Sequence, residues 1–124
     1  MSRIVLDVGQ CDPDHSQISE CLKREFDVEV QRANSFDEAI QSALDTPFDL
    51  ILINRILDAD GTSGMGILYE LKSQPSTANV PVMIISNYAD VQDTAVESGA
   101  VRGFGKAELA NPATTALLAQ FLSG

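Results

Sequence analysis

The sequence contains the run Phe48-Asp49-Leu50-Ile51-Leu52-Ile53-Asn54-Arg55, which indicates a strand. Four consecutive branched apolar residues between polar ones are typical of a strand buried on both faces, as in the centre of a parallel sheet. Asn54 then lies where the strand meets a loop. A carboxylate there could accept a phosphoryl group, but an amide cannot, because its nitrogen lone pair is delocalised and its oxygen carries no full charge.

On both sides of this run, strand-like and helix-like patterns alternate along the chain. Short apolar or alternating segments predict strands at residues 3–8, 27–31, 50–53, 81–86 and 100–104. Between them, apolar side chains recur at helical spacing, and the segments are bounded by Asp12-Pro13, Ser35 with Glu38, Pro47, Pro75, Gly99 and Asn111-Pro112. One residue does not fit, since Asp7 interrupts the apolar pattern of the first strand.

Five strand–helix repeats predict an α/β fold. Strands that alternate with helices form a parallel sheet with helices on both faces. We therefore expect one domain over residues 1–124, a (βα)5 doubly wound sheet, with ligands bound at the carboxyl ends of the strands. The polar residues that this rule brings together are Gln10, Cys11, Asp12, Asn54, Ser86 and Lys106.

Composition narrows the class of protein. The 124 residues are 44% hydrophobic, enough for a core, and the net charge of −10 disfavours direct binding to nucleic acid or to a membrane surface. No signal peptide is recognisable, and no apolar run approaches the roughly 20 residues needed to span a bilayer. Two cysteines, Cys11 and Cys21, are too few for a disulfide framework. These features predict a cytoplasmic protein.

The motifs at the strand ends resemble the receiver domain of bacterial two-component response regulators. The resemblance covers nearly the whole chain, and it rests on the 49–54 strand together with Cys11-Asp12-Pro13-Asp14-His15, Pro81-Val82-Met83-Ile84-Ile85-Ser86 and Glu97-Ser98-Gly99-Ala100-Val101-Arg102-Gly103-Phe104-Gly105-Lys106. It implies a flavodoxin-like sheet with strand order 2-1-3-4-5. In that family, an acidic pair and an aspartate hold Mg²⁺, and the aspartate takes phosphate from a histidine kinase.

Only part of the phosphorylation apparatus carries over to this sequence. Ser86 and Lys106 match the family's two phosphate-contacting positions at the ends of strands four and five. Asn54 occupies the phosphoacceptor position, and Gln10 and Cys11 occupy the positions of the acidic pair, with Asp12 next to them.

The position that reports phosphorylation in the family is also changed. Gly103 stands where the resemblance places a switching aromatic, and Phe104 follows one residue later, on the opposite face of the strand. The family's usual output face maps here to the fourth helix, the fifth strand and the last helix. The candidate interaction face therefore comprises Tyr88, Val91, Gln92, Ala95, Arg102 and Phe104.

These changes predict that Mg²⁺ binding is weak or absent and that the chain needs no cofactor. Mg²⁺ demands hard oxygen ligands in a near-ideal octahedron, whereas this pocket offers two amides, a thiol and Asp12. Without the ion, only Lys106 would offset the repulsion between a phosphoryl donor and an acidic protein. We therefore expect that Asn54→Asp alone does not restore phosphorylation.

Each polar residue of the pocket also has a structural interpretation. Asn54 either hydrogen-bonds Lys106 or Ser86 as a structural amide, or holds the domain in one fixed state. We expect Lys106 to pair with Asp12 rather than to bind an anion. Ser86 is as well explained by capping the following helix as by contacting phosphate.

Two further residues carry weaker signals. Cys11 beside a lysine would have the reactivity of a thiolate, but a small residue filling a vacated acidic site is the simpler interpretation. His15, in the first helical turn and without a second histidine in the chain, is expected at the surface.

The sequence predicts a pseudo-receiver, a signalling domain that works through protein contacts without aspartyl phosphorylation and without enzymatic activity. Its partner would be a histidine kinase or another signalling or output domain, and a homodimer is also compatible. One alternative is a conventional receiver that is phosphorylated on Asp12 or Asp58. A small cofactor-binding flavodoxin-like protein has neither a nucleophile–base pair nor a phosphate loop to support it.

Overall fold

The computed structural model describes residues 2–123 and contains four strands and five α-helices, which alternate except that no strand lies between the last two helices. The elements are β1 (Arg3–Val8), α1 (Asp12–Glu25), β2 (Val28–Ala33), α2 (Phe36–Asp45), β3 (Leu50–Asn54), α3 (Gly64–Ser73), β4 (Val82–Ile85), α4 (Ala89–Glu97) and α5 (Pro112–Leu122), with a short 3₁₀ helix at Lys106–Glu108 before α5. All strand pairs are parallel, and the order is β2-β1-β3-β4.

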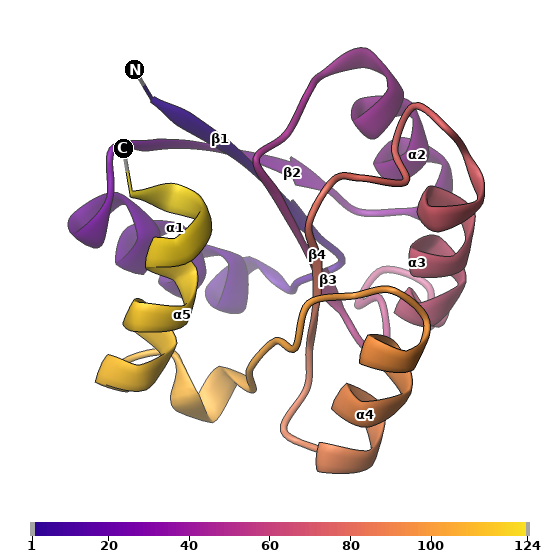
Figure 1. Ribbon diagram of the computed structural model, residues 1–124. Coiled ribbons are helices and arrows are strands. Elements are labelled where there is room, and N and C mark those ends of the chain that lie inside the picture. Colours follow the sequence, from indigo (N-terminus) through magenta and orange to yellow (C-terminus); the bar gives the residue numbers. More distant parts are fainter. Residues whose placement is uncertain (1, 124) are drawn as a thin grey trace.

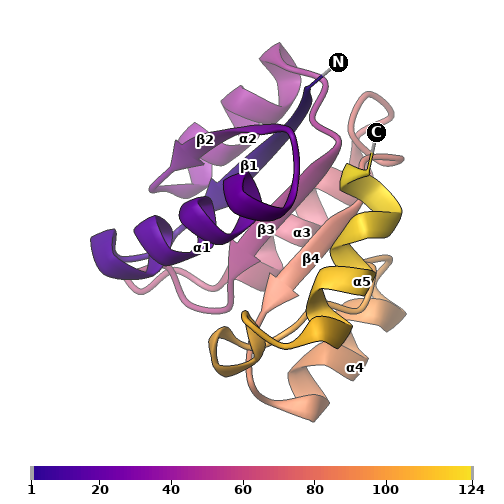
Figure 2. The ribbon, with the colours of Figure 1, turned by 90° about the vertical axis from the view of Figure 1, so that its left-hand side faces the viewer.

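Helices cover both faces of the sheet. Figure 1 views the sheet along its edge, with α1 and α5 on one side and α2, α3 and α4 on the other, and in Figure 2 α1 and α5 lie in front of the strands. Neighbouring residues of each strand enter opposite cores: Ile51 and Ile53 pack with α2 and α3, whereas Leu50 and Leu52 pack with α1 and α5. The doubly wound α/β architecture is therefore confirmed.

The prediction of a fifth strand at residues 100–104 was wrong. Residues 100–104 run beside β4, with the Val101 N–H donating to the Val82 carbonyl at 2.9 Å and the Ser86 N–H donating to the Phe104 carbonyl at 3.0 Å. They form no regular ladder, so the described sheet has four strands and lacks the fifth position of the expected 2-1-3-4-5 order. The cause is the side chain of Gln92, which enters between the two segments.

Local signals position the helices as expected. Ser35 caps α2 by accepting a hydrogen bond from the Glu38 N–H at 3.1 Å, and Asn111 caps α5 in the same way. Among residues 2–123, no helix combines the length and the apolar character that crossing a membrane requires.

Candidate functional site

A hollow of about 160 Å³ lies at the carboxyl ends of β3 and β4. Its walls are Asn54, Arg55, Ile56, Ile85, Ser86, Asn87, Tyr88 and Lys106. Three predicted site residues, Asn54, Ser86 and Lys106, thus meet at one place. Gln10, Cys11 and Asp12 do not line it.

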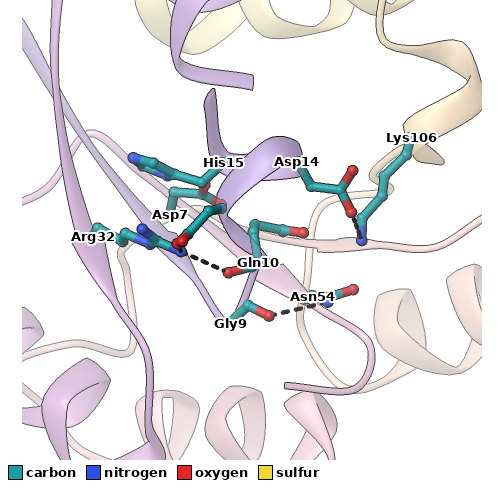
Figure 3. A network of polar contacts seen from close by, with 9 residues as sticks. Asp7, Gly9, Gln10, Asp14, His15, Arg32, Asn54 and Lys106 are labelled. Atoms are coloured by element: carbon teal, nitrogen blue, oxygen red, sulfur yellow. Dashed lines mark hydrogen bonds and ion pairs between the residues drawn. The ribbon is translucent and has the colours of Figure 1, made fainter. Parts of the chain in front are cut away.

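Asn54 is held by the loop after β1. Its Nδ2 donates to the carbonyl oxygen of Gly9 at 3.1 Å (Figure 3). The prediction that Asn54 hydrogen-bonds Lys106 or Ser86 was therefore wrong. Gly9 has a φ of 79°, and a Cβ there would approach Leu57 Cγ to 2.7 Å, so glycine permits the close turn that presents this carbonyl. The Asn54 amide thus donates to the Gly9 carbonyl oxygen. A carboxylate at position 54 would be repelled by that oxygen.

Lys106 is neutralised by a carboxylate that the sequence interpretation did not select. Its Nζ lies 2.7 Å from Asp14 Oδ2, and this hydrogen bond, with the charge of Lys106, holds the pKa of Asp14 below its ordinary value (Figure 3). The expected partner, Asp12, instead lies 2.7 Å from Arg32 Nη2 and is 88% exposed. Lys106 therefore enters the hollow with its charge already paired.

The two residues at the acidic-pair positions differ in environment. Gln10 is 98% buried, since only 2% of its surface is exposed, and neither its Oε1 nor its Nε2 has a hydrogen-bond partner among residues 2–123. Cys11 is half-buried and ends the loop as the N-cap residue of α1, without a side-chain cap bond. Its thiol contacts the Asp14 carboxylate and helps to lower the pKa of that group.

A hydrogen-bonded aspartate–histidine pair beside this loop was missed by the sequence interpretation. Asp7 is fully buried in β1, and its Oδ2 lies 2.6 Å from His15 Nδ1 in the first turn of α1. Burial raises the pKa of Asp7, and the hydrogen bond to His15 opposes that rise. His15, which was predicted at the surface, is half-buried, and its ring binds Asp7. The one signal available was the polar interruption of an apolar strand.

Ser86 makes backbone contacts at the rim of the hollow. Its Oγ accepts a hydrogen bond from the Tyr88 N–H at 3.1 Å. Because α4 begins at Ala89 with Tyr88 as its N-cap residue, Ser86 shapes the turn before the helix and does not cap the helix itself.

The predicted interaction face is only partly at the surface. Tyr88 is 58% exposed, with the Arg55 guanidinium 5.2 Å from its ring centroid, and Arg102 is exposed and pairs with Asp93 at 2.7 Å. Val91 is half-buried. The other three members, Gln92, Ala95 and Phe104, are buried and so were wrong as surface contacts.

Gly103 lies directly against β4. A Cβ at this position would overlap the carbonyl oxygen of Ile84 and approach Met83 Cβ to 3.2 Å. An aromatic side chain has no room there. Phe104 packs into the core with α1 and α5, on the face opposite α4.

The residues present do not fit the Mg²⁺ site that the receiver fold implies. Nowhere in residues 2–123 do three His, Cys, Asp or Glu side chains converge as metal ligands. No carboxylate lines the hollow among the residues that the structure describes. The Asn54 amide donates to Gly9, and the carboxylate of Asp14 is engaged by Lys106.

Comparison with known proteins places the chain by its fold. No protein-family model matches the sequence, and no curated protein is significantly similar to it. Solved structures match at full length. The signal receiver domain of a DNA-binding response regulator from Colwellia psychrerythraea 34H superposes with a TM-score of 0.81 and 21% identity, covering 95% of this chain and 96% of that one.

Other solved structures agree. A putative response regulator from Chloroflexus aurantiacus gives a TM-score of 0.79 at 19% identity, with 100% of both chains covered. The receiver domain of a sensor histidine kinase from Pseudomonas aeruginosa PAO1, with a magnesium ion coordinated in its active-site cleft, gives 0.75 at 18% identity, with 100% of both chains covered. The fold is therefore that of response regulator receiver domains.

Proposed function

We propose that the chain is a pseudo-receiver: a signalling domain that binds a protein partner and is not phosphorylated on aspartate. The observation that carries this proposal is that the polar side chains Asn54 and Lys106 at the hollow are bound by other groups of the protein. Asn54, an amide that cannot accept a phosphoryl group, donates to Gly9, and Lys106, the cation that would stabilise one, is paired with Asp14.

The proposal includes the absence of a bound metal. Magnesium is coordinated in the active-site cleft of the histidine kinase receiver from Pseudomonas aeruginosa. Here the corresponding edge of the sheet offers amides and one lysine-bound carboxylate, a poor set of ligands for a hard cation that needs several free oxygens. Without the ion, the cations in the wall of the hollow that an incoming phosphoryl donor would meet are Arg55 and Lys106, and Lys106 is already paired with Asp14.

The surroundings of Asp12 and Asp58 favour neither residue as an alternative phosphate acceptor. Asp12 faces solvent and binds Arg32, away from Lys106. Asp58 is exposed and does not line the hollow. A hollow of about 160 Å³ is also too small for a flavin, below the 300–1,000 Å³ of common ligand pockets. Partner binding without catalysis remains the best-supported function.

Intact-mass spectrometry after incubation with acetyl phosphate and Mg²⁺ tests the proposal. We expect no phosphoryl mass gain in the wild type, because it has no free carboxylate beside Lys106. We also expect none in Asn54→Asp, because the metal ligands are still missing. Phosphate-affinity gel retardation gives an independent readout.

A conventional receiver domain that carries the acceptor aspartate serves as the positive control for the reagent. A mass gain in the wild-type chain that disappears in Asp12→Asn or Asp58→Asn would overturn the proposal in favour of an unusual acceptor. A gain only in Asn54→Asp would show that the pocket still supports the chemistry and lacks just the nucleophile.

A further inference from the structure

Gln92 is a buried polar residue in the middle of α4. Only 5% of its surface is exposed, although amide side chains are mostly found at protein surfaces. Burying an amide without hydrogen-bond partners is costly, so a buried glutamine is expected to have partners for its donor and acceptor groups.

All hydrogen-bonding groups of the Gln92 side chain have partners. Nε2 donates to the carbonyl oxygens of Ile84 at 2.8 Å and of Ser86 at 3.2 Å. Oε1 accepts from the Gly103 N–H at 2.9 Å. One side chain therefore joins α4, the end of β4 and the segment 101–104.

The amide occupies a place that a backbone hydrogen bond would otherwise take. Since the Val101 N–H donates to the Val82 carbonyl, a regular parallel ladder would next join the Gly103 N–H to the Ile84 carbonyl. Gln92 binds both of these groups instead. This insertion explains why residues 100–104 run beside β4 without forming a strand.

The bridge also reaches the rim of the hollow. The Ser86 carbonyl is one of its acceptors, and the Ser86 N–H donates to Phe104 at 3.0 Å. Movement of Ser86 toward the hollow, or of Gly103 away from β4, would break hydrogen bonds of a buried amide. Leaving buried polar groups unpaired is unfavourable, so such movement is opposed.

We infer that Gln92 is a clamp that fixes α4, the end of β4 and residues 101–104 as one unit, so the surface around Tyr88 and Arg102 keeps one conformation whatever the hollow contains. This inference rests on the proposed function and adds how the interaction face is held. The residue acts by positioning backbone groups and contacts no ligand.

Amide hydrogen exchange measured by NMR tests the clamp. In Gln92→Leu, which keeps the apolar volume and loses the hydrogen bonds, we expect the Gly103 amide to exchange at least about tenfold faster than in the wild type. Gln41→Leu is the matched control, because Gln41 is exposed on α2 and bonds only Asp45. There the Gly103 rate should change less than about twofold. An unchanged Gly103 rate in folded Gln92→Leu overturns the clamp.

Gln92→Glu separates the hydrogen bonds from general packing. A protonated glutamic acid keeps one donor and one acceptor, whereas an ionised one would face two carbonyl oxygens without a donor. Protection of Gly103 should therefore fall below that of the wild type as the pH rises and the new carboxyl ionises, and should recover as the pH is lowered. Wild-type protection of Gly103 throughout about pH 5–8 contradicts a role through the amide bonds.

The wild type alone also provides a test, which matters if Gln92→Leu does not fold. Both Nε2 protons of Gln92 should exchange at least about tenfold more slowly than those of Gln41. Equal rates overturn the clamp. A phosphoryl mass gain would instead defeat the proposed function and leave these exchange rates unaffected, so the two failures are distinguishable.

Discussion

At the scale of single residues, the Asp7–His15 pair couples stability to pH. Burial raises the pKa of Asp7 above its ordinary value of 3.8, so the folded protein holds that proton more tightly than the unfolded chain. The contribution of this group is therefore most favourable at acidic pH and declines as pH rises through the folded pKa. His15, 2.6 Å away, limits the decline by hydrogen-bonding the carboxylate.

Replacement of His15 should destabilise the folded protein at neutral pH. We expect His15→Ala to lower the free energy of unfolding by roughly 3 kcal/mol near pH 7, because it leaves a buried carboxylate without its partner. The loss should shrink as the pH is lowered to acidic values, because Asp7 then takes up a proton and the unpaired charge disappears. Urea denaturation at neutral and at acidic pH measures both quantities.

The control for this prediction is the same histidine change in an Asp7→Asn background. With a neutral amide at position 7, loss of His15 should cost less and should show little dependence on pH. An equal cost at both pH values and in both backgrounds would mean that His15 contributes packing alone.

Residue types and their strand-end positions were predictable, but the pairing of charges was not. Asn54, Ser86 and Lys106 meet as the parallel-sheet rule requires. Asp12 and Asp14 are two positions apart on α1 and so point about 200° apart, which sends one to Arg32 and the other to Lys106. Only the register of α1 over the sheet decides which carboxylate meets which cation.

At the scale of secondary structure elements, the segment after α4 depends on the absence of a side chain at Gly103. A Cβ there would overlap the carbonyl oxygen of Ile84, a backbone atom that cannot move alone. We therefore expect Gly103→Ala to destabilise the fold by about 1–3 kcal/mol, as overpacking does. Thermal or urea denaturation measures the change.

Gly66 in α3 is the matched control, because nothing lies within 4 Å of a Cβ built there. Since alanine favours helix over glycine, Gly66→Ala should stabilise the protein by about 0.5–1 kcal/mol. The prediction for Gly103 fails if both alanine variants change stability in the same direction.

Periodicity predicted the elements well wherever backbone pairs with backbone. Four strands and five helices lie where the apolar patterns and capping residues indicated. The fifth strand was mispredicted because the Gly103 N–H and the Ile84 carbonyl, which a regular ladder would join, both bond the side chain of Gln92. Periodicity carries no information about which side chain enters a sheet. Because the Gln92 side chain is buried between these segments, it is not an exposed member of the predicted interaction face.

At the scale of the whole molecule, the two faces of the sheet have different covers, and the proposed binding surface lies at one edge. In Figure 1, α4 and the chain that leads to α5 form the edge farthest from β2. Tyr88 and Arg102, the exposed members of the predicted interaction face, lie at this edge, and the protein's net charge of −10 favours a partner with a basic surface.

Tyr88 should be an energetic centre of that interface. Tyrosine is enriched among the residues that dominate binding energy, and the Arg55 guanidinium 5.2 Å from its ring orients it. Once affinity capture has identified the partner, we expect Tyr88→Ala to weaken binding at least about tenfold. Tyr69→Ala is the control, since Tyr69 is similarly exposed, at 50% against 58%, but lies on α3. Binding measured by titration calorimetry should be within about threefold of wild type for that variant. If Tyr69→Ala weakens binding and Tyr88→Ala does not, the partner binds α3, and the α4 edge is not the interface.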